Sequence, residues 1–294
     1  MREYSELALA TSFRSRVRTT ESDSAHRIYP HELLSFMQEA ADIQGIQTQT
    51  SSKDFAERNL AYMLSKIRVD LNSVPLRTGD ELCIVTWTQA VKGVRIIRDF
   101  DFFLSEPLEE NYLGSGQMEL FVVDLESRKP QRLADVFGED YKKTFSNSTK
   151  AYTDLAEKLP PLFSSWQEAK DSGLCKISRK VSYSQVDANL HMNNIHYLAG
   201  ATDAVASMEV ESADHLLLFD WLKMQVNYES ETLFGESVHF FVKEMSHAEN
   251  DFEKIQSEDD IIVEKEVVLE GWIEERACPA FRSKLLYSIN RLSR

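Results

Sequence analysis

The segment SKIRVDLNSVPLRTGDELCIVTW (residues 65–87) has a second copy in the same chain, LKMQVNYESETLFGESVHFFV (residues 222–242). With one single-residue gap, Lys66 aligns with Lys223 and Gly79 aligns with Gly235. Each copy alternates apolar and polar residues, breaks at a glycine followed by an acid, and then alternates again. This pattern predicts a strand, a turn and another strand in each copy. The chain therefore contains an internal repeat, which predicts two related domains.

A long apolar segment precedes each copy of the repeat. Residues 29–47 and 191–209 each place apolar side chains at helical spacing, and in the first segment these are Leu33, Phe36, Met37 and Ala40. Helices this apolar are unsuited to the surface, so we expect each half to curve an antiparallel sheet around one long helix. The predicted class is α+β, with the order strand, helix, strands in each half. Two such copies in one chain would resemble a symmetric dimer.

The domain boundary is predicted from the segment KLPPLFSSWQEAKDSG (residues 158–173), which contains two prolines and has no clear period. A chain of 294 residues is long enough for two domains. We expect an N-terminal domain over residues 1–157, a linker over 158–175 and a C-terminal domain over 176–294. The oligomeric state is left open between a monomeric pseudo-dimer and a homodimer.

Charge and composition exclude several classes of function. The chain has 33 basic and 48 acidic residues and a net charge of −15, which argues against binding nucleic acid. Glu249 to Glu275 holds 11 acids and predicts a solvated acidic surface. No apolar stretch approaches the roughly 20 residues of a membrane helix, so we expect a cytoplasmic protein without membrane contact. Three cysteines without CxxC spacing predict neither a disulfide framework nor a zinc site.

The densest polar cluster of the sequence is VSYSQVDANLHMNNIHYL (residues 181–198). Asp187, Asn189 and His191 occupy alternate positions, so their side chains would point to one side of an extended segment. A carboxylate, an amide and an imidazole can together orient a water, remove its proton and stabilise an oxyanion. The adjacent Asn193 and Asn194 are suited to cap the following helix. The alternative is a polar loop whose Asp and Asn residues only cap turns.

The two halves differ at these positions. Aligning the helices places Ala25, Arg27 and Tyr29 opposite the three motif residues, so the first half would lack all three groups. In the strand repeat, Glu231 aligns with Val74, which places an acid where the other half is apolar. We therefore predict an asymmetric protein with chemistry in the second half only, although Glu231 alone could be an ordinary surface residue.

The eight residues D-A-N-L-H-M-N-N (187–194) resemble the D-x-N-x-H-x-N-N motif of the acyl-acyl carrier protein (acyl-ACP) thioesterases. Further segments resemble this family in the same order, over about residues 5–245: AYMLSKIRVDLNSVP, TGDELCIVTW, GVRIIRDFDFF and NYESE. The resemblance implies a tandem (double) hot-dog fold, in which each half wraps an antiparallel sheet around a long central helix. It also implies hydrolysis of the thioester between a fatty acyl chain and acyl carrier protein.

The resemblance also implies roles for individual residues. Asp187, Asn189 and His191 match the catalytic positions, and Glu231 matches an acid on the neighbouring strand. In the plant enzymes a cysteine follows that acid, whereas this chain has Thr232. Cys83, Cys175 and Cys278 all lie outside the motif, so a Cys-His nucleophile has no support in the sequence.

We therefore expect direct attack by water on the thioester. Glu231 and His191 would share the role of base, Asp187 would orient His191, and Asn189 would bind the thioester carbonyl. Asn193 and Thr232 are the predicted substrate contacts. A zinc site built from Asp187, His191 and Glu231 is chemically conceivable, but thioester hydrolysis requires no metal and no HExxH motif is present. We expect neither a metal nor a cofactor.

Substrate binding raises two further expectations. Some apolar residues of the first half either line an acyl tunnel or belong to the ordinary core, which is the commoner case, and the candidates are Phe36, Met37, Leu60, Met63 and Leu64. Acyl carrier proteins are acidic, as is this chain, so docking would need a local basic patch. The candidates are Arg14, Arg16, Arg95, Arg98 and the C-terminal arginines. An acyl-coenzyme A thioesterase, a hydroxyacyl dehydratase and a catalytically silent acyl-binding protein remain the alternative functions.

Overall fold

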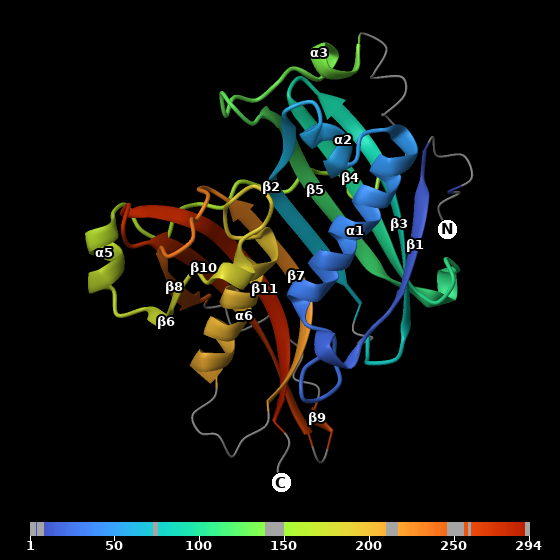
Figure 1. Cartoon of the computed structure of the whole chain (residues 1–294). Coiled ribbons are helices and arrows are strands. Elements are labelled where there is room, and N and C mark those ends of the chain that lie inside the picture. Colours follow the sequence, from blue (N-terminus) through green and yellow to red (C-terminus); the bar gives the residue numbers. More distant parts are fainter. Residues whose placement is uncertain are drawn as a thin grey trace. The chain divides into compact units, whose positions relative to one another are not determined.

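The computed structural model describes residues 4, 9–72, 76–138, 150–209, 217–245, 256–257 and 260–291. The chain divides into two compact units, residues 1–157 and 158–294. The first unit, shown in blue to green in Figure 1, contains β1 (Thr11–Arg16), η2 (Thr19–Glu21), α1 (Pro30–Thr48), α2 (Ser52–Ala56), β2 (Leu60–Leu71), β3 (Glu81–Lys92), β4 (Arg95–Leu104), η3 (Glu109–Asn111), β5 (Tyr112–Asp124) and α3 (Leu133–Phe137).

An antiparallel sheet forms the body of the first unit. Its strands run in the order β1-β3-β4-β5-β2. Helix α1 lies across one face of this sheet and contacts β1 and β3 (Figure 1). Leu33, Phe36, Met37 and Ala40 are all buried, which confirms the apolar stripe predicted for this helix.

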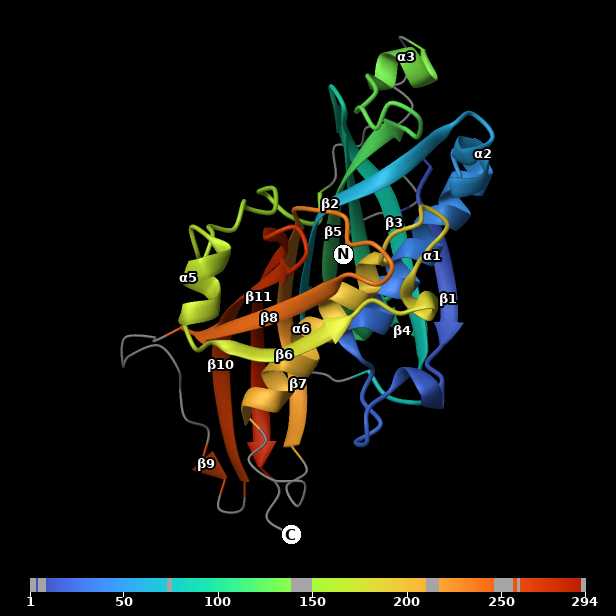
Figure 2. The same cartoon turned by 60° about the vertical axis from the view of Figure 1, so that its left-hand side comes forward.

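The second unit repeats this arrangement. It contains α5 (Trp166–Asp171), β6 (Cys175–Lys180), η4 (Tyr183–Gln185), α6 (Asn194–Glu209), β7 (Leu217–Tyr228), β8 (Ser237–Glu244), β9 (Gln256–Ser257), β10 (Asp260–Ile273) and β11 (Cys278–Arg291). The sheet order is β6-β8-β10-β11-β7, with β9 paired to β10. Helix α6 lies against β6 and β8 (Figure 2). Each unit is thus a long helix on an antiparallel sheet.

The two segments that reveal the repeat do not form hairpins. β2 and β3 follow one another in the sequence, but β2 pairs with β5 whereas β3 pairs with β1 and β4. The same holds for β7, which pairs with β11, and β8, which pairs with β10 and β6. The alternation of apolar residues specifies which face of a strand is buried, but it leaves the strand order open.

Glycines permit the close contact between helix and sheet. A Cβ atom added at Gly116 of β5 would lie 2.7 Å from Cε of Met37 on α1. A Cβ atom at Gly200 of α6 would lie 2.2 Å from Cζ of Phe240 on β8. Both distances are shorter than van der Waals contact, so a larger residue at either position would force the neighbouring side chain to shift.

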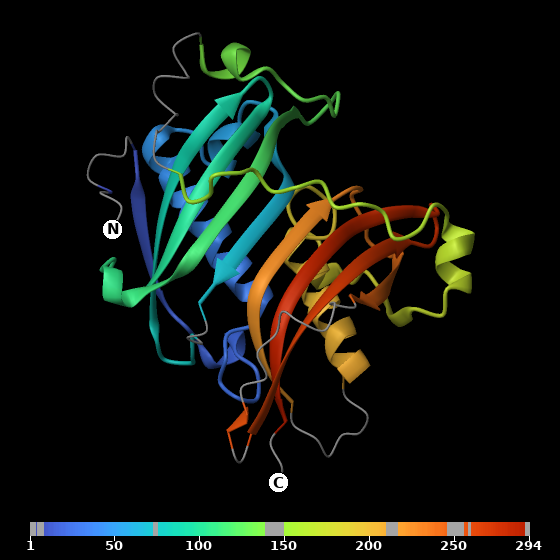
Figure 3. The ribbon, with the colours of Figure 1, turned by 180° about the vertical axis from the view of Figure 1, so that it is seen from behind.

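The predicted linker is an ordered segment that contains helix α5. In the first unit, the chain after residue 150 crosses the face of the sheet opposite α1 (Figure 3), where Asp99 Oδ2 accepts a hydrogen bond from Ala151 N–H at 2.7 Å. In the second unit, Glu270 accepts one from Phe163 N–H at 3.2 Å. Buried carboxylates thus bind the backbone of the chain at Ala151 in the first unit and at Phe163 in the second.

Glu270 belongs to the acidic segment over residues 249–275. It is fully buried and pairs with Arg282, so the expectation that this segment is a solvated acidic surface was wrong for Glu270.

The predicted basic patch is also wrong in part. Arg98 is buried and donates hydrogen bonds to Gln44 and Thr86, so its charge does not reach the surface. Arg14 is exposed but pairs with Glu106 at 2.6 Å. Similarly, Arg95 lies 3.7 Å from Glu119. The side chains of Arg291 and Arg294 lie outside the described residues.

The predicted acyl-tunnel residues lie in the interior of the first unit. Phe36, Met37 and Leu64 are buried, and Leu60 and Met63 are half-buried. Such burial is expected both for core residues and for residues lining a tunnel, so the tunnel stays a prediction. Among the described helices, none combines the length and the apolar content that a membrane span requires.

Candidate active site

The motif residues form a tight turn between η4 and α6. Asp187 N–H donates to His191 O at 3.0 Å, and Leu190 N–H donates to Asp187 O at 3.0 Å. Leu190 adopts a left-handed backbone with φ 67°. The carboxylate of Asp187 accepts a hydrogen bond from Asn189 N–H at 2.8 Å, which closes the turn. The extended segment that we predicted was wrong, because the aspartate offers the backbone a competing hydrogen bond.

This turn places the imidazole of His191 between two carboxylates. Nδ1 lies 3.7 Å from Asp187 Oδ1, and Nε2 lies 3.9 Å from Glu231 Oε1. The side chain of His191 is 8% exposed, against 20% for Asp187 and 29% for Glu231. Both distances exceed that of a hydrogen bond, so the carboxylates flank the ring without a direct bond to it. The structure thus brings together the acid, imidazole and second acid predicted from separate segments.

Backbone pairing holds the loop of Glu231 beside the motif. His191 and Leu233 form an antiparallel bridge, and Met192 N–H donates to Thr232 O at 2.7 Å. These contacts hold Glu231 beside the motif, although the two segments are about 40 residues apart in the sequence. Its predicted proximity to His191 follows from this bridge.

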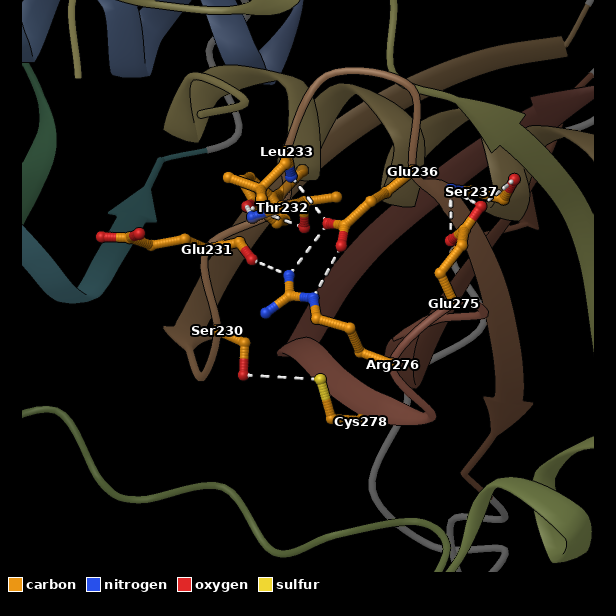
Figure 4. Close-up of polar contacts among 10 residues, drawn as sticks. Ser230, Glu231, Thr232, Leu233, Glu236, Ser237, Glu275, Arg276 and Cys278 are labelled. Atoms are coloured by element: carbon orange, nitrogen blue, oxygen red, sulfur yellow. Dashed lines mark hydrogen bonds and ion pairs between the residues drawn. The ribbon is translucent and has the colours of Figure 1, made fainter. Parts of the chain in front are cut away.

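Arg276 orients the backbone of the Glu231 loop. It donates to the carbonyl oxygen of Glu231 and, through Nε, to Glu236 Oε1 at 2.7 Å. Glu236 in turn accepts from Leu233 N–H at 2.7 Å, and its hydrogen bond to Arg276 raises the pKa of that guanidinium. Figure 4 shows the side chain of Glu231 pointing away from Arg276. The guanidinium of Arg276 therefore holds the backbone of the loop and does not bind the side-chain carboxylate of Glu231. Sequence reasoning missed Arg276 because it is distant from both motifs.

Thr232 anchors the same loop to helix α6. It is fully buried, its hydroxyl accepts a hydrogen bond from Tyr197 OH at 3.0 Å, and its N–H donates to Tyr197 OH at 3.0 Å. Burial raises the pKa of Tyr197 to about 12. The substrate contact predicted for Thr232 stays a prediction, since its polar groups are bonded within the protein. Tyr197 gave no signal in the sequence beyond its helical position.

Asn189 and Asn193 of the motif have different surroundings. Asn193 Oδ1 accepts from Ile195 N–H at 3.1 Å, which confirms that it caps helix α6. Its predicted contact with substrate stays a prediction. The side chain of Asn189 is half-buried and, among the described residues, has no hydrogen-bond partner within the protein. Its amide is therefore available to a ligand.

The first unit contains the same turn, shifted by two residues from the alignment that we predicted. Asp23 N–H donates to Arg27 O at 2.8 Å, and Ala25 N–H donates to Asp23 Oδ1 at 2.8 Å. His26 adopts a left-handed φ of 62°, as Leu190 does in the second unit. Asp23 is therefore the counterpart of Asp187, so the prediction that all three groups are absent was wrong.

Only part of the site is thus duplicated. Ala25 occupies the place of Asn189, and Arg27 occupies the place of His191. Asp23 closes this turn although no histidine follows it, so the aspartate has a structural task that does not depend on the imidazole. Val74, the predicted counterpart of Glu231, lies outside the described residues.

Most of the chain matches two family descriptions. Residues 10–141 match the description "Acyl-ACP thioesterase N-terminal domain", and residues 169–277 match "Acyl-ACP thioesterase C-terminal domain". The chain belongs to the acyl-ACP thioesterase family. This thioesterase is accordingly a thioester hydrolase, and its family acts on fatty acyl thioesters. Among curated proteins, none matches the sequence.

Solved structures confirm the fold of this thioesterase. An acyl-ACP thioesterase from Bacteroides thetaiotaomicron is similar over 95% of this chain and 98% of its own, with 16% identity and a TM-score of 0.69. A 12:0-ACP thioesterase from Umbellularia californica is similar over 95% and 94%, with 14% identity and a TM-score of 0.72. The thioesterase therefore has the α+β tandem hot-dog fold.

Proposed function

We propose that this enzyme hydrolyses fatty acyl thioesters of acyl carrier protein by general-base attack of water, releasing free fatty acid and holo carrier protein. The observation that carries the proposal is the imidazole of His191 placed between Asp187 and Glu231. Family membership supports acyl carrier protein as the leaving group. The similar protein from Umbellularia californica is named for a 12:0-ACP substrate.

The geometry supports the following sequence of steps. His191 Nε2, with Glu231 beside it, removes a proton from water as the water oxygen bonds to the thioester carbonyl carbon. Asp187 stabilises the positive charge that then develops on the ring. The side-chain amide of Asn189 donates a hydrogen bond to the carbonyl oxygen as it becomes negative. The C–S bond breaks, and the departing thiolate takes the proton held by His191.

An acyl-coenzyme A thioesterase would use the same chemistry with another leaving group. The decisive experiment compares the rate of acyl release from a panel of acyl-ACP and acyl-coenzyme A substrates. We expect fast release from the carrier protein, with kcat lowered about 10²- to 10⁴-fold in His191→Ala and Glu231→Gln. Cys278→Ser is the matched control, since Cys278 contacts Ser230 and has no role in the proposed mechanism. Its kcat should be unchanged.

Three results would contradict the proposal. Equal or faster release from coenzyme A would make the enzyme an acyl-coenzyme A thioesterase. Normal turnover in Glu231→Gln would remove that carboxylate from the mechanism. Absence of release from every thioester would favour a silent acyl-binding protein.

A further inference from the structure

Large apolar side chains are exposed on the two loops that form the site. Tyr183 is 87% exposed, Leu190 75%, Leu233 45% and Phe234 65%. The loops are joined by the bridge between His191 and Leu233 and by the hydrogen bond from Gly235 N–H to Val181 O at 3.0 Å. The four side chains, here termed the apolar rim, therefore belong to one connected structure bordering His191. Several large apolar side chains exposed on adjoining loops are a candidate surface for binding a partner.

The fold itself does not require this apolar rim. In the first unit, Arg27 and Arg77 form the same bridge, and Arg77 N–H donates to Asp80 as Leu233 N–H donates to Glu236. The residues at the four rim positions of that unit are all polar: Thr19, His26, Arg77 and Thr78. The same turns thus form without any large apolar side chain. The rim is specific to the half that carries His191.

Leu190 gives a second indication of function. Its left-handed backbone is a conformation that residues with a bulky side chain adopt rarely. Here such a residue also leaves most of its side chain in water. A leucine at this position contributes little to folding, so a binding role accounts for it better than a structural role.

We propose that the apolar rim is the surface that docks acyl carrier protein, a proposal that rests on the function proposed above. The rim borders His191 and Glu231, so the carrier attached to the thioester sulfur must approach past it. Tyrosine, phenylalanine and leucine are also well suited to a compact contact between proteins, where a few apolar anchors supply most of the affinity.

Charge supports an apolar mode of docking. The enzyme has a net charge of −15, so an acidic carrier is repelled at long range. Of the arginines expected to attract it, Arg98 is buried, and Arg14 and Arg95 lie beside the acids Glu106 and Glu119. Near the rim, Glu236 is neutralised by Arg276 at 2.7 Å. An apolar contact therefore gives the carrier an attraction that does not depend on the overall charge.

The test replaces two rim residues by those of the first unit. The double variant Tyr183→Thr/Phe234→Thr introduces the residues found at Thr19 and Thr78, which the same turns already accommodate. We expect KM for acyl-ACP to rise about tenfold or more. For acyl-coenzyme A, which lacks the carrier body, kcat/KM should stay within about twofold of wild type. Leu108→Thr removes an exposed leucine elsewhere and is the matched control.

Binding of unacylated holo carrier protein, measured by calorimetry, tests the inference even if hydrolysis fails. We expect the double variant to weaken this binding about tenfold while the control does not. An unchanged Kd and KM, or an equal loss with acyl-coenzyme A, would overturn the docking surface. Conversion of a wild-type dimer to a monomer by the double variant would also overturn it, since a second copy would then cover the rim. Wild-type enzyme that binds the carrier but hydrolyses no thioester would contradict the proposed function alone.

Discussion

Replacing Asp187 by asparagine separates the two tasks of this residue. The amide oxygen of asparagine can still accept the hydrogen bond from Asn189 N–H, so the turn should persist. The negative charge 3.7 Å from His191 Nδ1 is lost. For two unit charges at that distance, effective dielectric constants of about 80 to 20 give about 1 to 4 kcal/mol. If this energy stabilises the protonated ring in the transition state, kcat falls about 5-fold to 1,000-fold. Because Asp187 is 20% exposed, we expect a loss of about 100-fold, in the middle of this range.

The assay measures kcat at saturating acyl thioester, together with the thermal unfolding midpoint. Asp23→Asn is the control, since Asp23 closes the same turn in the unit that lacks the histidine. Both variants should unfold within a few degrees of wild type, and only Asp187→Asn should lose activity. The reasoning would be refuted if Asp187→Asn kept kcat within about twofold while Asp187→Ala did not. The aspartate would then act by shaping the loop alone.

Three further outcomes are expected from the structure. Tyr197→Phe should lower the free energy of unfolding by about 1 to 3 kcal/mol, measured by urea denaturation, because it leaves the buried N–H of Thr232 unpaired; Thr232→Val, which keeps that N–H bonded, should cost less. Gly200→Ala should cost about 1 to 3 kcal/mol through overlap with Phe240, and Phe240→Leu should restore part of it; purely additive effects would argue against the overlap. Burial lowers the pKa of His196 below its ordinary 6.5, so below about pH 6.5 the unfolded state binds a proton at this residue more readily than the folded state does. The free energy of unfolding should therefore fall as the pH drops below about 6.5. In His196→Gln, a series of urea denaturations at different pH values should show a smaller fall.

The sequence predicted the elements well because their patterns are long. The repeat around Gly79 and Gly235 and the helix over residues 29–47 are confirmed, since many positions contribute to each pattern. The alignment of the two helices was less secure. Both helices carry apolar residues around much of their circumference, so a shift of two residues still superimposes apolar positions. The hydrogen bonds of Asp23 and Asp187, which identify the correct alignment, are not visible in hydropathy.

The sequence correctly predicted that His191 and Glu231 lie close together, but it wrongly predicted an extended backbone for the motif. His191 and Glu231 do meet, but through a turn and a bridge that alternation of residue types cannot reveal. Arg98 lies in a run of β4 buried on both faces, so its position in the sequence gave no sign that it points inward. Arg276 and Tyr197 were missed because single polar residues carry no periodic signal. The positions of the His191–Glu231 pair, Arg98, Arg276 and Tyr197 all depend on contacts between segments that are distant in the sequence.

Leu190 has a consequence for efforts to stabilise the enzyme. A generic design procedure would replace a left-handed, solvent-exposed leucine by glycine or asparagine, and the protein would be expected to tolerate heat better. If leucine is retained there for binding a partner, that gain would be made at the expense of catalytic throughput on the natural substrate. Thermal screening alone would then select enzymes that are robust and slow. Engineering of this enzyme should therefore measure the turnover of carrier-bound substrate as well as the melting temperature of each variant.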